Sequence, residues 1–269
     1  MVKTWLTLLR AKMNRRTKKL KRELNRLNSY QERIAHLKDT YLNERLFLLA
    51  SGPSLGMVDK EELRSKIKDS LTFSIKQAYL EFTKETDFHF INDCNLPMIN
   101  GYAGYRYGIK SGPIVVASSG YPEPHAKTRF AEGQQWDMFC RVLDPLVYPK
   151  SNLGRLCENN NFDDGLFDKR VERPCGPSIT LETVIYMALH VGVKDIYAIG
   201  WDSGDKVGEH FYKSETHLTS NRNFEYEMVQ KGSGPLYNWL KTKDVNLHLV
   251  SEVSSLSDKI PRIKLKDIK

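Results

Sequence analysis

Small and polar residues follow five apolar runs of the sequence, and each run has the length of one buried strand. In chain order they are Ser51, Gly52, Pro53 and Ser54; Lys76 and Gln77; Asn92 and Asp93; Ser118 and Ser119; and Gly200, Trp201 and Asp202. Such groups bind phosphate and sugar oxygens through hydrogen bonds. Turn chemistry explains each group alone, but the succession of five predicts a polar ligand site.

His210 is the candidate general base for that site. It stands in the polar stretch WDSGDKVGEHFYKSETH, which follows the last of the five runs. A neutral imidazole there could accept a proton near physiological pH. The alternative is a loop histidine without a role. His89 and His248 alternate with apolar residues, and His190 lies near a predicted helix end, so we expect these three to be structural.

We expect no metal and no cofactor. The cysteines are Cys94, Cys140, Cys157 and Cys175. They form no C-x-x-C pair, which argues against a zinc site or a disulfide framework. His210 and its acidic neighbours match no metal-ligand spacing. Asp202 and Asp205 leave one alternative open, in which they hold Mg²⁺ together with phosphates.

Strands alternating with helices are predicted to bring these residues together. We expect strands at 46–50, 71–75, 88–92, 114–118, 196–200 and 245–250, and helices at 60–67, 77–84, 180–191, 223–242 and around 136–142. This alternation predicts an α/β, Rossmann-like fold with a mainly parallel sheet and helices on both faces. Ligands of such sheets lie beyond the carboxyl ends of the strands.

Positive charge is concentrated at the start of the chain. The net charge is +8, and residues 1–28 hold ten Lys and Arg against Glu23. Residues 3–40 are predicted to form one long helix with an intermittent apolar stripe. It could lie on an anionic membrane surface, pair with a copy of itself, or pack on its own domain. Nucleic acid is not an expected partner, because the rest of the chain lacks a basic surface interleaved with aromatics.

Three parts are expected along the chain. They are a basic helical extension at 1–43, a Rossmann-like domain at 44–258 and a basic tail at 259–269. An irregular segment at 101–174, rich in Gly, Pro, Tyr, Asn and Asp, is predicted to be an acceptor-binding or lid insertion. No apolar run reaches the ~20 residues of a membrane span, and no secretory signal is recognisable. We therefore expect a cytoplasmic protein, with possible peripheral contact to the inner membrane.

Two segments resemble a known family. FLLASGPSLGMVD, at 47–59, is similar to the opening strand and turn of single-domain bacterial sialyltransferases, and GVKDIYAIGWD, at 192–202, is similar to their later strand end. A wider group shares both signatures, including flagellin-glycosylation accessory factors and pterin diphosphokinase-like proteins. The resemblance implies a glycosyltransferase that moves an acidic ulosonic-type sugar, sialic acid or a relative, from a CMP donor. It also implies inversion without a metal, in lipopolysaccharide or capsule synthesis, on a glycan or glycolipid acceptor.

The resemblance also implies roles for individual residues. The turn Gly52-Pro53-Ser54 and Asn92 would contact the nucleotide, Ser178 and Thr180 would line the donor carboxylate and phosphate, and His210 would deprotonate the acceptor hydroxyl. Ser51 and Lys76 stand where the family has asparagines. The family's paired tyrosines have no clear equivalent, and Lys206 or Lys213 could serve the leaving group instead.

Two alternatives from other classes stay open. One is a Mg²⁺-dependent diphosphokinase of the pterin type, which would use Asp93, Asp202 and Asp205 with ATP. The other is a non-catalytic scaffold that carries a helical oligomerisation arm on a nucleotide-binding fold. Metal dependence would identify the first, and failure to bind CMP would identify the second.

Overall fold

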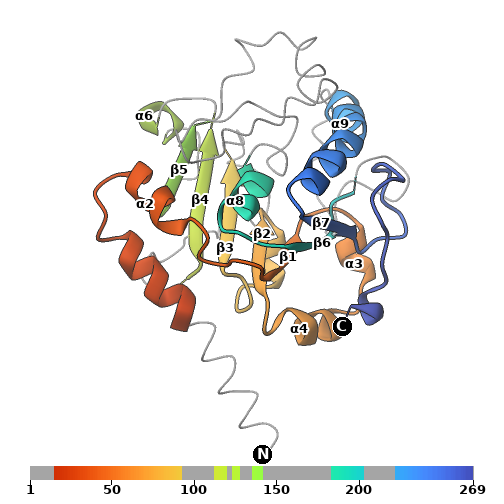
Figure 1. Ribbon diagram of the computed structural model, residues 1–269, viewed down its shortest axis with the longest axis horizontal. Helices are drawn as coiled ribbons and strands as arrows, with labels where there is room; N and C mark the ends of the chain where they lie inside the picture. Colours follow the sequence, from red (N-terminus) through yellow and green to blue (C-terminus); the bar gives the residue numbers. More distant parts are fainter. Residues whose placement is uncertain are drawn as a thin grey trace, which may run out of the picture.

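In a computed structural model, the chain forms a seven-stranded sheet between two layers of helices (Figure 1). The structure describes residues 15–92, 112–119, 123–127, 135–141, 183–202 and 222–268. The strand order is β5-β4-β3-β2-β1-β6-β7, and every neighbouring pair is parallel. The fold is therefore α/β and Rossmann-like, as the alternating pattern predicts.

The strands are β1 (Arg45–Leu49), β2 (Leu71–Ile75), β3 (Phe88–Asn92), β4 (Ile114–Ser119), β5 (Met138–Arg141), β6 (Asp195–Ile199) and β7 (Asn246–Leu249). The helices are the segment 15–24, called helix 15–24 below, α2 (Tyr30–Leu37), α3 (Ser54–Met57), α4 (Lys60–Ile67), α5 (Ala78–Glu81), α6 (Glu123–Ala126), α8 (Ile185–His190), α9 (Arg222–Thr242) and the 3-10 turn η2 (Leu265–Asp267).

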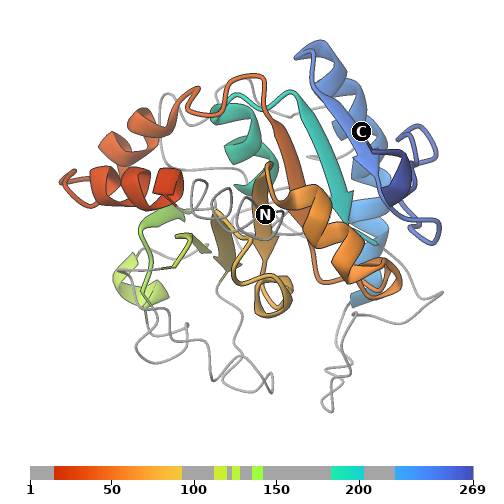
Figure 2. The ribbon, with the colours of Figure 1, turned by 90° about the horizontal axis from the view of Figure 1, so that it is seen from below.

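Each face of the sheet has its own core. Helix 15–24, α2, α8 and α9 cover one face. Their apolar residues pack against the strand side chains on that face and form the largest buried cluster with them. On the other face, α3, α4, α5 and η2 cover β1 and β6, and α6 lies over β4 and β5. The two layers are visible from below in Figure 2. Strands buried on both faces explain why the sequence shows continuous apolar runs rather than alternation.

Six predicted strands are confirmed to within one or two residues, but the helix predicted around 136–142 is wrong. That segment is β5, which pairs with β4 through Val116 and Met138. A short apolar run fits a strand or a buried helix equally well, and the free edge of β4 decides between them. Asp137, just before the strand, accepts a hydrogen bond from the Val115 amide at 2.8 Å and anchors the pairing.

The single helix predicted for 3–40 is also wrong within the described residues, because the chain turns after residue 24 and α2 begins anew. Ser29 is the N-cap of α2. Its hydroxyl accepts from the Glu32 amide at 3.1 Å, and the Glu32 carboxylate accepts from the Ser29 amide at 3.0 Å. This capping box stabilises a new helix start. An S-x-x-E signal is readable in the sequence and would have placed the break.

The segment from helix 15–24 to β1 packs on its own sheet. Leu20, Leu24, Ile34 and Leu37 are buried in the largest core cluster. Packing on its own domain is therefore observed for the described part of the N-terminal segment. The domain boundaries at 43 and 258 stay predictions, and near the other end Ile260 is buried in the same cluster. Among the described residues, no helix combines the length and hydropathy needed to cross a membrane.

Buried polar groups fasten helix 15–24 to the amino-terminal edge of the sheet. The Lys21 ammonium lies 2.9 Å from the Asp137 carboxylate and donates to the Pro113 carbonyl at 2.6 Å. The Thr17 hydroxyl donates to the carboxylate of Asp87, which directly precedes β3. Breaking a buried ion pair leaves an uncompensated charge, so these contacts specify where the helix docks.

Replacing Asp87 with asparagine should stabilise the fold increasingly as pH rises. Burial raises the pKa of the Asp87 carboxyl group from 3.8 to about 7, despite hydrogen bonds from Thr17 and Thr72 that lower it. Between those values the unfolded chain has lost a proton that the folded chain keeps, so the contribution of Asp87 to wild-type stability falls as pH rises from about 4 to about 7. Asparagine has no such proton. The variant should gain on the order of 2–4 kcal/mol over wild type by about pH 8, measured by urea unfolding across the range.

Asp137→Asn is the matched control. It removes the partner of the buried Lys21 ammonium, whose side chain is only 4% exposed, and should destabilise the fold by about 3–5 kcal/mol at neutral pH. Burial lowers the pKa of His89 to about 3, which makes stability rise with pH between about 3 and 6.5. The His89 effect is common to wild type and Asp87→Asn, and it cancels in the difference between their free energies of unfolding. A difference between Asp87→Asn and wild type that does not change with pH would contradict the assignment.

Candidate functional site

The strand order reverses between β1 and β6. From β1 the chain adds β2, β3, β4 and β5 on one side, and then returns to place β6 and β7 on the other. In open α/β sheets, ligands bind outside the carboxyl ends of the strands at such a switch point. The turn at 51–54 follows β1 and the segment 200–202 follows β6, so the topology brings two of the predicted polar groups to the switch point.

Hydrogen bonds join these two segments directly. The Gly52 amide donates to the Gly200 carbonyl at 2.7 Å. The Gly200 amide donates to the Ser54 hydroxyl at 2.9 Å, and the Ser54 amide donates to the Asp202 carboxylate at 2.7 Å. The segments 51–54 and 200–202 therefore hold each other in place through hydrogen bonds and do not behave as independent loops.

Glycine is required at both close approaches. A Cβ atom on Gly52 would lie 2.4 Å from the Gly200 carbonyl oxygen, and one on Gly200 would lie 2.2 Å from the Ala50 carbonyl oxygen. Gly200 also has φ of +74°, a left-handed conformation that L side chains rarely adopt. Backbone packing between the ends of β1 and β6 thus explains why Gly52 and Gly200 are glycines.

Asp202 bridges three strand ends. Beside the Ser54 amide, its carboxylate accepts from the Ser251 hydroxyl at 3.0 Å. The Ser251 hydroxyl accepts in turn from the Ser254 amide, and the Ser254 hydroxyl donates to the Trp201 carbonyl. Both carboxylate oxygens accept hydrogen bonds from the protein. Positioning of the turn at 51–54 is therefore a better explanation for Asp202 than Mg²⁺ ligation. The sequence analysis missed Ser251 and Ser254, although VSEVSS after the last strand is a readable cluster of hydroxyls.

Gln77 carries a buried amide with an unsatisfied donor. The residue is 4% exposed, and its Nε2 atom has no hydrogen-bond partner among the described residues. The Ser51 hydroxyl donates to the Ile75 carbonyl at 3.1 Å and lies 3.4 Å from the Gln77 Oε1 atom. A buried amide without a partner costs about 1–3 kcal/mol, so this donor suits a ligand oxygen.

Two further buried polar atoms lie at the carboxyl edge. The Nε1 atom of Trp201, after β6, and the Oγ1 atom of Thr183, at the start of the helical segment leading into α8, also have no hydrogen-bond partner among the described residues. The first was predicted as a site residue and the second was not. Thr183 could have been identified from the sequence, since hydroxyl residues at a helix start bind anions.

The ends of β2, β3 and β4 complete the edge. Lys76 turns the chain after β2 with φ of +49° and donates its amide to the Phe90 carbonyl at 3.0 Å. Asn92 ends β3 and is paired in register with Ser118 of β4. Ser118 and Ser119 are buried within β4, and the Ser118 hydroxyl donates to the Ile91 carbonyl at 3.4 Å. The serines therefore belong to the strand rather than to a loop beyond it.

Several predicted site residues lie outside the described residues: Asp93, Ser178, Thr180, Asp205, Lys206, His210 and Lys213. Their roles stay predictions.

Three other histidines are structural, as expected. His89 is fully buried with its Nδ1 atom 3.0 Å from the Ser74 hydroxyl, the His190 Nε2 atom lies 2.6 Å from the Ile34 carbonyl oxygen, and the ring of His248 stacks on Tyr197.

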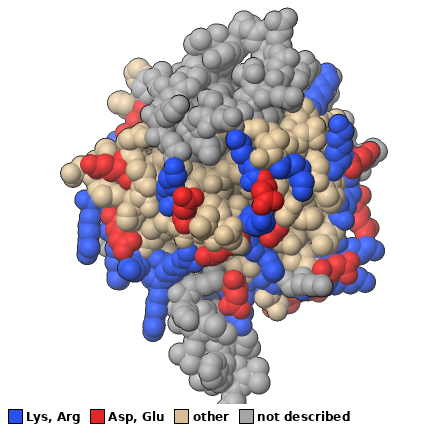
Figure 3. Space-filling view, viewed as in Figure 1, with Lys and Arg blue, Asp and Glu red and all other residues tan. Residues whose placement is uncertain are grey.

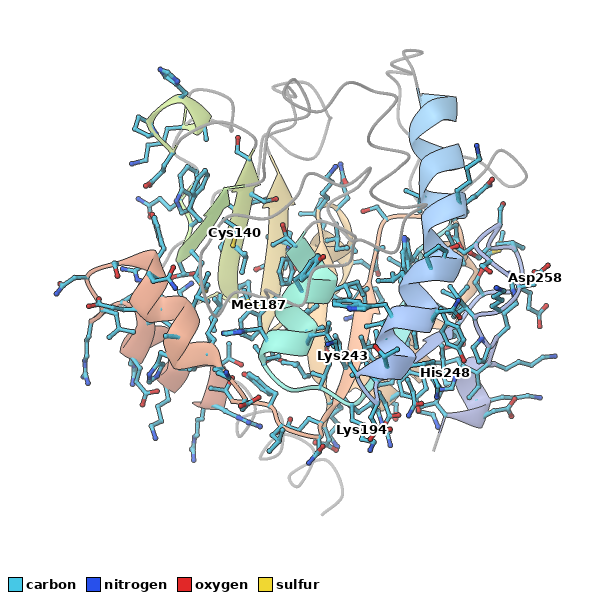
Figure 4. The ribbon with its side chains drawn as sticks, turned by 45° about the horizontal axis from the view of Figure 1, so that its top comes forward. Cys140, Met187, Lys194, Lys243, His248 and Asp258 are labelled. Atoms are coloured by element: carbon cyan, nitrogen blue, oxygen red, sulfur yellow. The ribbon has the colours of Figure 1, made fainter. Side chains whose placement is uncertain are left out.

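A hollow of about 370 Å³ borders the switch point. Ser54 and Ser251 belong both to its lining and to the hydrogen bonds around Asp202. Apolar side chains, including Met57 and Val250, line much of the rest. Figure 4 shows the same edge tilted forward, with Cys140 on β5 and Met187 on α8. No group of three His, Cys, Asp or Glu side chains suited to a metal ion occurs within the described ranges.

Comparisons with known proteins give structural neighbours only. No family model and no curated protein matches the sequence. The fold is similar to that of the MAf glycosyltransferase from Magnetospirillum magneticum AMB-1, with 16% identity and a TM-score of 0.49, over 86% of this chain and 35% of that one. It is also similar to the sialyltransferase CstII from Campylobacter jejuni in complex with CMP-3FNeuAc, with 15% identity and a TM-score of 0.45, over 82% of this chain and 86% of that one.

Proposed function

We propose that the chain is a glycosyltransferase that moves an acidic ulosonic-type sugar from a CMP donor to a glycan or glycolipid acceptor. The observation that carries the proposal is the switch point itself. There, the Gly52-Pro53-Ser54 turn is hydrogen-bonded to the end of β6, beside the unsatisfied Gln77 donor. The resemblance of the two motifs to bacterial sialyltransferases supplies the donor class.

The chemistry needs few protein groups. CMP is a good leaving group, and a ulosonic sugar passes through an oxocarbenium-like state, so orientation and hydrogen bonds to phosphate supply much of the catalysis. His210 takes the proton of the acceptor hydroxyl as that oxygen attacks the anomeric carbon in line, with inversion. The departing phosphate is met by donors of the site, for which Lys206 and Lys213 are candidates. No metal and no cofactor enters this scheme.

Localisation and partners form part of the same proposal. The protein acts in the cytoplasm in lipopolysaccharide or capsule synthesis, in peripheral contact with the inner membrane through its basic N-terminal segment. The segment at 101–174 contributes acceptor contacts. Association with a second copy of the chain is compatible with this scheme, and sedimentation of the purified protein measures it.

CMP alone should stabilise the protein against heat. We expect a rise in melting temperature with CMP that is independent of Mg²⁺, and little change with UDP, GDP or ATP at the same concentration, because binding to the folded state alone raises stability. Gln77→Leu should largely abolish the CMP shift while leaving the unliganded melting temperature equal or higher, since it removes an unsatisfied buried amide. The measurement is a thermal-shift panel on both proteins.

Gln31→Leu is the matched control, because Gln31 is exposed on α2, on the covering layer that contains helix 15–24. It should keep the full CMP shift. A shift seen only with ATP and Mg²⁺ would replace the transferase with the diphosphokinase alternative. No shift with any nucleotide, together with no CMP binding by calorimetry, would favour the non-catalytic scaffold.

A further inference from the structure

Helix 15–24 divides into two opposite faces. At 3.6 residues per turn, Thr17, Leu20, Lys21 and Leu24 fall on one stripe, and all four are buried. The opposite stripe is made of cations: Arg15, Lys18, Lys19 and Arg22, followed by Arg26 in the turn after the helix, all exposed. We call these five residues the cationic face. In Figure 3, Lys and Arg side chains gather at the lower left of the molecule, where this helix lies.

Few acidic groups offset the cationic face. Glu23 pairs with Lys19 at 3.7 Å and lies 3.3 Å from His36. Arg16 lies to the side of the cationic face and pairs with Glu44 at 2.6 Å, close over the Tyr41 ring. The cationic face therefore keeps a strong net positive charge. Such a surface attracts polyanions, and its effect falls with ionic strength because the charges are exposed.

The buried stripe is already occupied. Leu20 and Leu24 belong to the largest core cluster, and Lys21 and Thr17 hold the amino-terminal edge of the sheet through Asp137 and Asp87. The described part of the helix has no free apolar side to insert among lipid chains. Any membrane contact by these residues is electrostatic, at about 1 kcal/mol for each Lys or Arg near an anionic surface.

We propose that the cationic face binds an anionic lipid bilayer by charge, on the edge of the sheet opposite the candidate site. A bilayer fits this face better than single-stranded nucleic acid does, because the face presents a row of Lys and Arg without aromatic side chains for base stacking. The rigid docking through Lys21 fixes the orientation of the whole domain on the bilayer.

The orientation has a consequence for the acceptor, which rests on the proposed function. Helix 15–24 contacts residues just before β3, β4 and β5, whereas the candidate site lies beyond the carboxyl ends. The length of β3 gives the minimum separation between these two edges: its five residues span about 17 Å at about 3.4 Å per residue. A bilayer on the cationic face therefore leaves the site facing water. Acceptors whose sugar terminus extends away from the headgroups fit this geometry, and sugars linked directly to a lipid at the surface do not.

Vesicle co-sedimentation tests the binding. Wild type should bind vesicles of phosphatidylcholine with about one third phosphatidylglycerol, should not bind pure phosphatidylcholine, and should dissociate as salt is raised. Lys18→Glu with Arg22→Glu should weaken binding at least tenfold, since two cations contribute about 2 kcal/mol. Lys259→Glu with Lys266→Glu changes the net charge equally at exposed positions of the C-terminal segment and should weaken it far less. Equal losses in both variants, or binding to duplex nucleic acid without binding to vesicles, would overturn the proposal.

Quenching by headgroup-labelled lipids tests the orientation without any transfer assay. A fluorophore is attached at Asn25→Cys, beside the cationic face, or at His125→Cys, on α6 after β4; both positions are exposed. Cys94, Cys157 and Cys175 are changed to serine, and Cys140 is buried. Quenching should be strong at position 25 and weak at position 125. Equal or reversed quenching would refute the orientation, and absence of transferase activity would leave both results interpretable, because neither depends on catalysis.

Discussion

Replacing His210 with alanine should lower transfer by about 100-fold or more while leaving the affinity for CMP within about twofold. The physical reason is that, in the proposed function, the imidazole acts on the acceptor proton, whereas the turn after β1 and Gln77 would hold CMP. The loss should appear in kcat rather than in the dissociation constant for CMP. The measurements are initial rates with a CMP-sugar donor and calorimetry with CMP.

His125→Ala is the control for His210→Ala. His125 lies on α6, after β4, and its side chain is exposed, so it shares the carboxyl edge without belonging to the switch point. The control should keep wild-type rates. Near-normal turnover of the His210 variant would disprove the assignment of the base. Loss of CMP binding in that variant would show that the residue positions the nucleotide instead.

Replacing Gly200 with alanine should destabilise the fold by about 3 kcal/mol or more and abolish the CMP-induced thermal shift. The alanine Cβ would lie 2.2 Å from the Ala50 carbonyl oxygen in a backbone with φ of +74°. The left-handed conformation costs about 1–2 kcal/mol, and the backbone clash adds to it. To relieve the clash, β1 and β6 must separate, which breaks the hydrogen bond from the Gly52 amide to the Gly200 carbonyl.

Two glycine variants separate strain from crowding. Gly192 has φ of +88°, and the nearest atoms to its added Cβ, at 3.1 and 3.2 Å, belong to Leu42 and Asp39 on the amino-terminal edge. Gly192→Ala should lose stability by about 1–2 kcal/mol and keep CMP binding. Gly234 lies inside α9 with Ser257 as its near neighbour, and Gly234→Ala should change stability by less than about 1 kcal/mol. Chemical unfolding gives all three values. A Gly200 variant as stable as the Gly234 variant would contradict the packing argument.

Most of the fold could be predicted from the sequence because its signals are local. The strands β1, β2 and β3 are apolar runs bounded by Gly, Pro, Ser and Asn, and α4 begins at Asp59, which caps the helix by accepting from the Glu62 amide at 2.8 Å. These signals act within a few residues. The polar residues after each strand could be identified for the same reason, because a parallel sheet collects its carboxyl ends at one edge.

Tertiary contacts decided the parts that local signals leave open. The run at 138–141 became β5 because β4 offers it a free edge. Lys21 reads as one more exposed cation in a basic helix, yet it is buried against Asp137, which is 116 residues away in the sequence. No local pattern distinguishes a buried lysine from its exposed neighbours, because its partner comes from another element.

Asp202 shows the same division within the candidate site. Its position after β6 was predicted, and with it a contact to a ligand or to Mg²⁺. In the folded chain its carboxylate accepts hydrogen bonds from the Ser54 amide and the Ser251 hydroxyl. The sequence by itself determined which elements form and which polar residues end the strands, since propensity and hydropathy act over short distances. Only the tertiary structure decided which of those polar groups the protein satisfies and which, like the Gln77 amide, keep a donor without a partner among the described residues, because hydrogen-bond partners come from strands far apart in the chain.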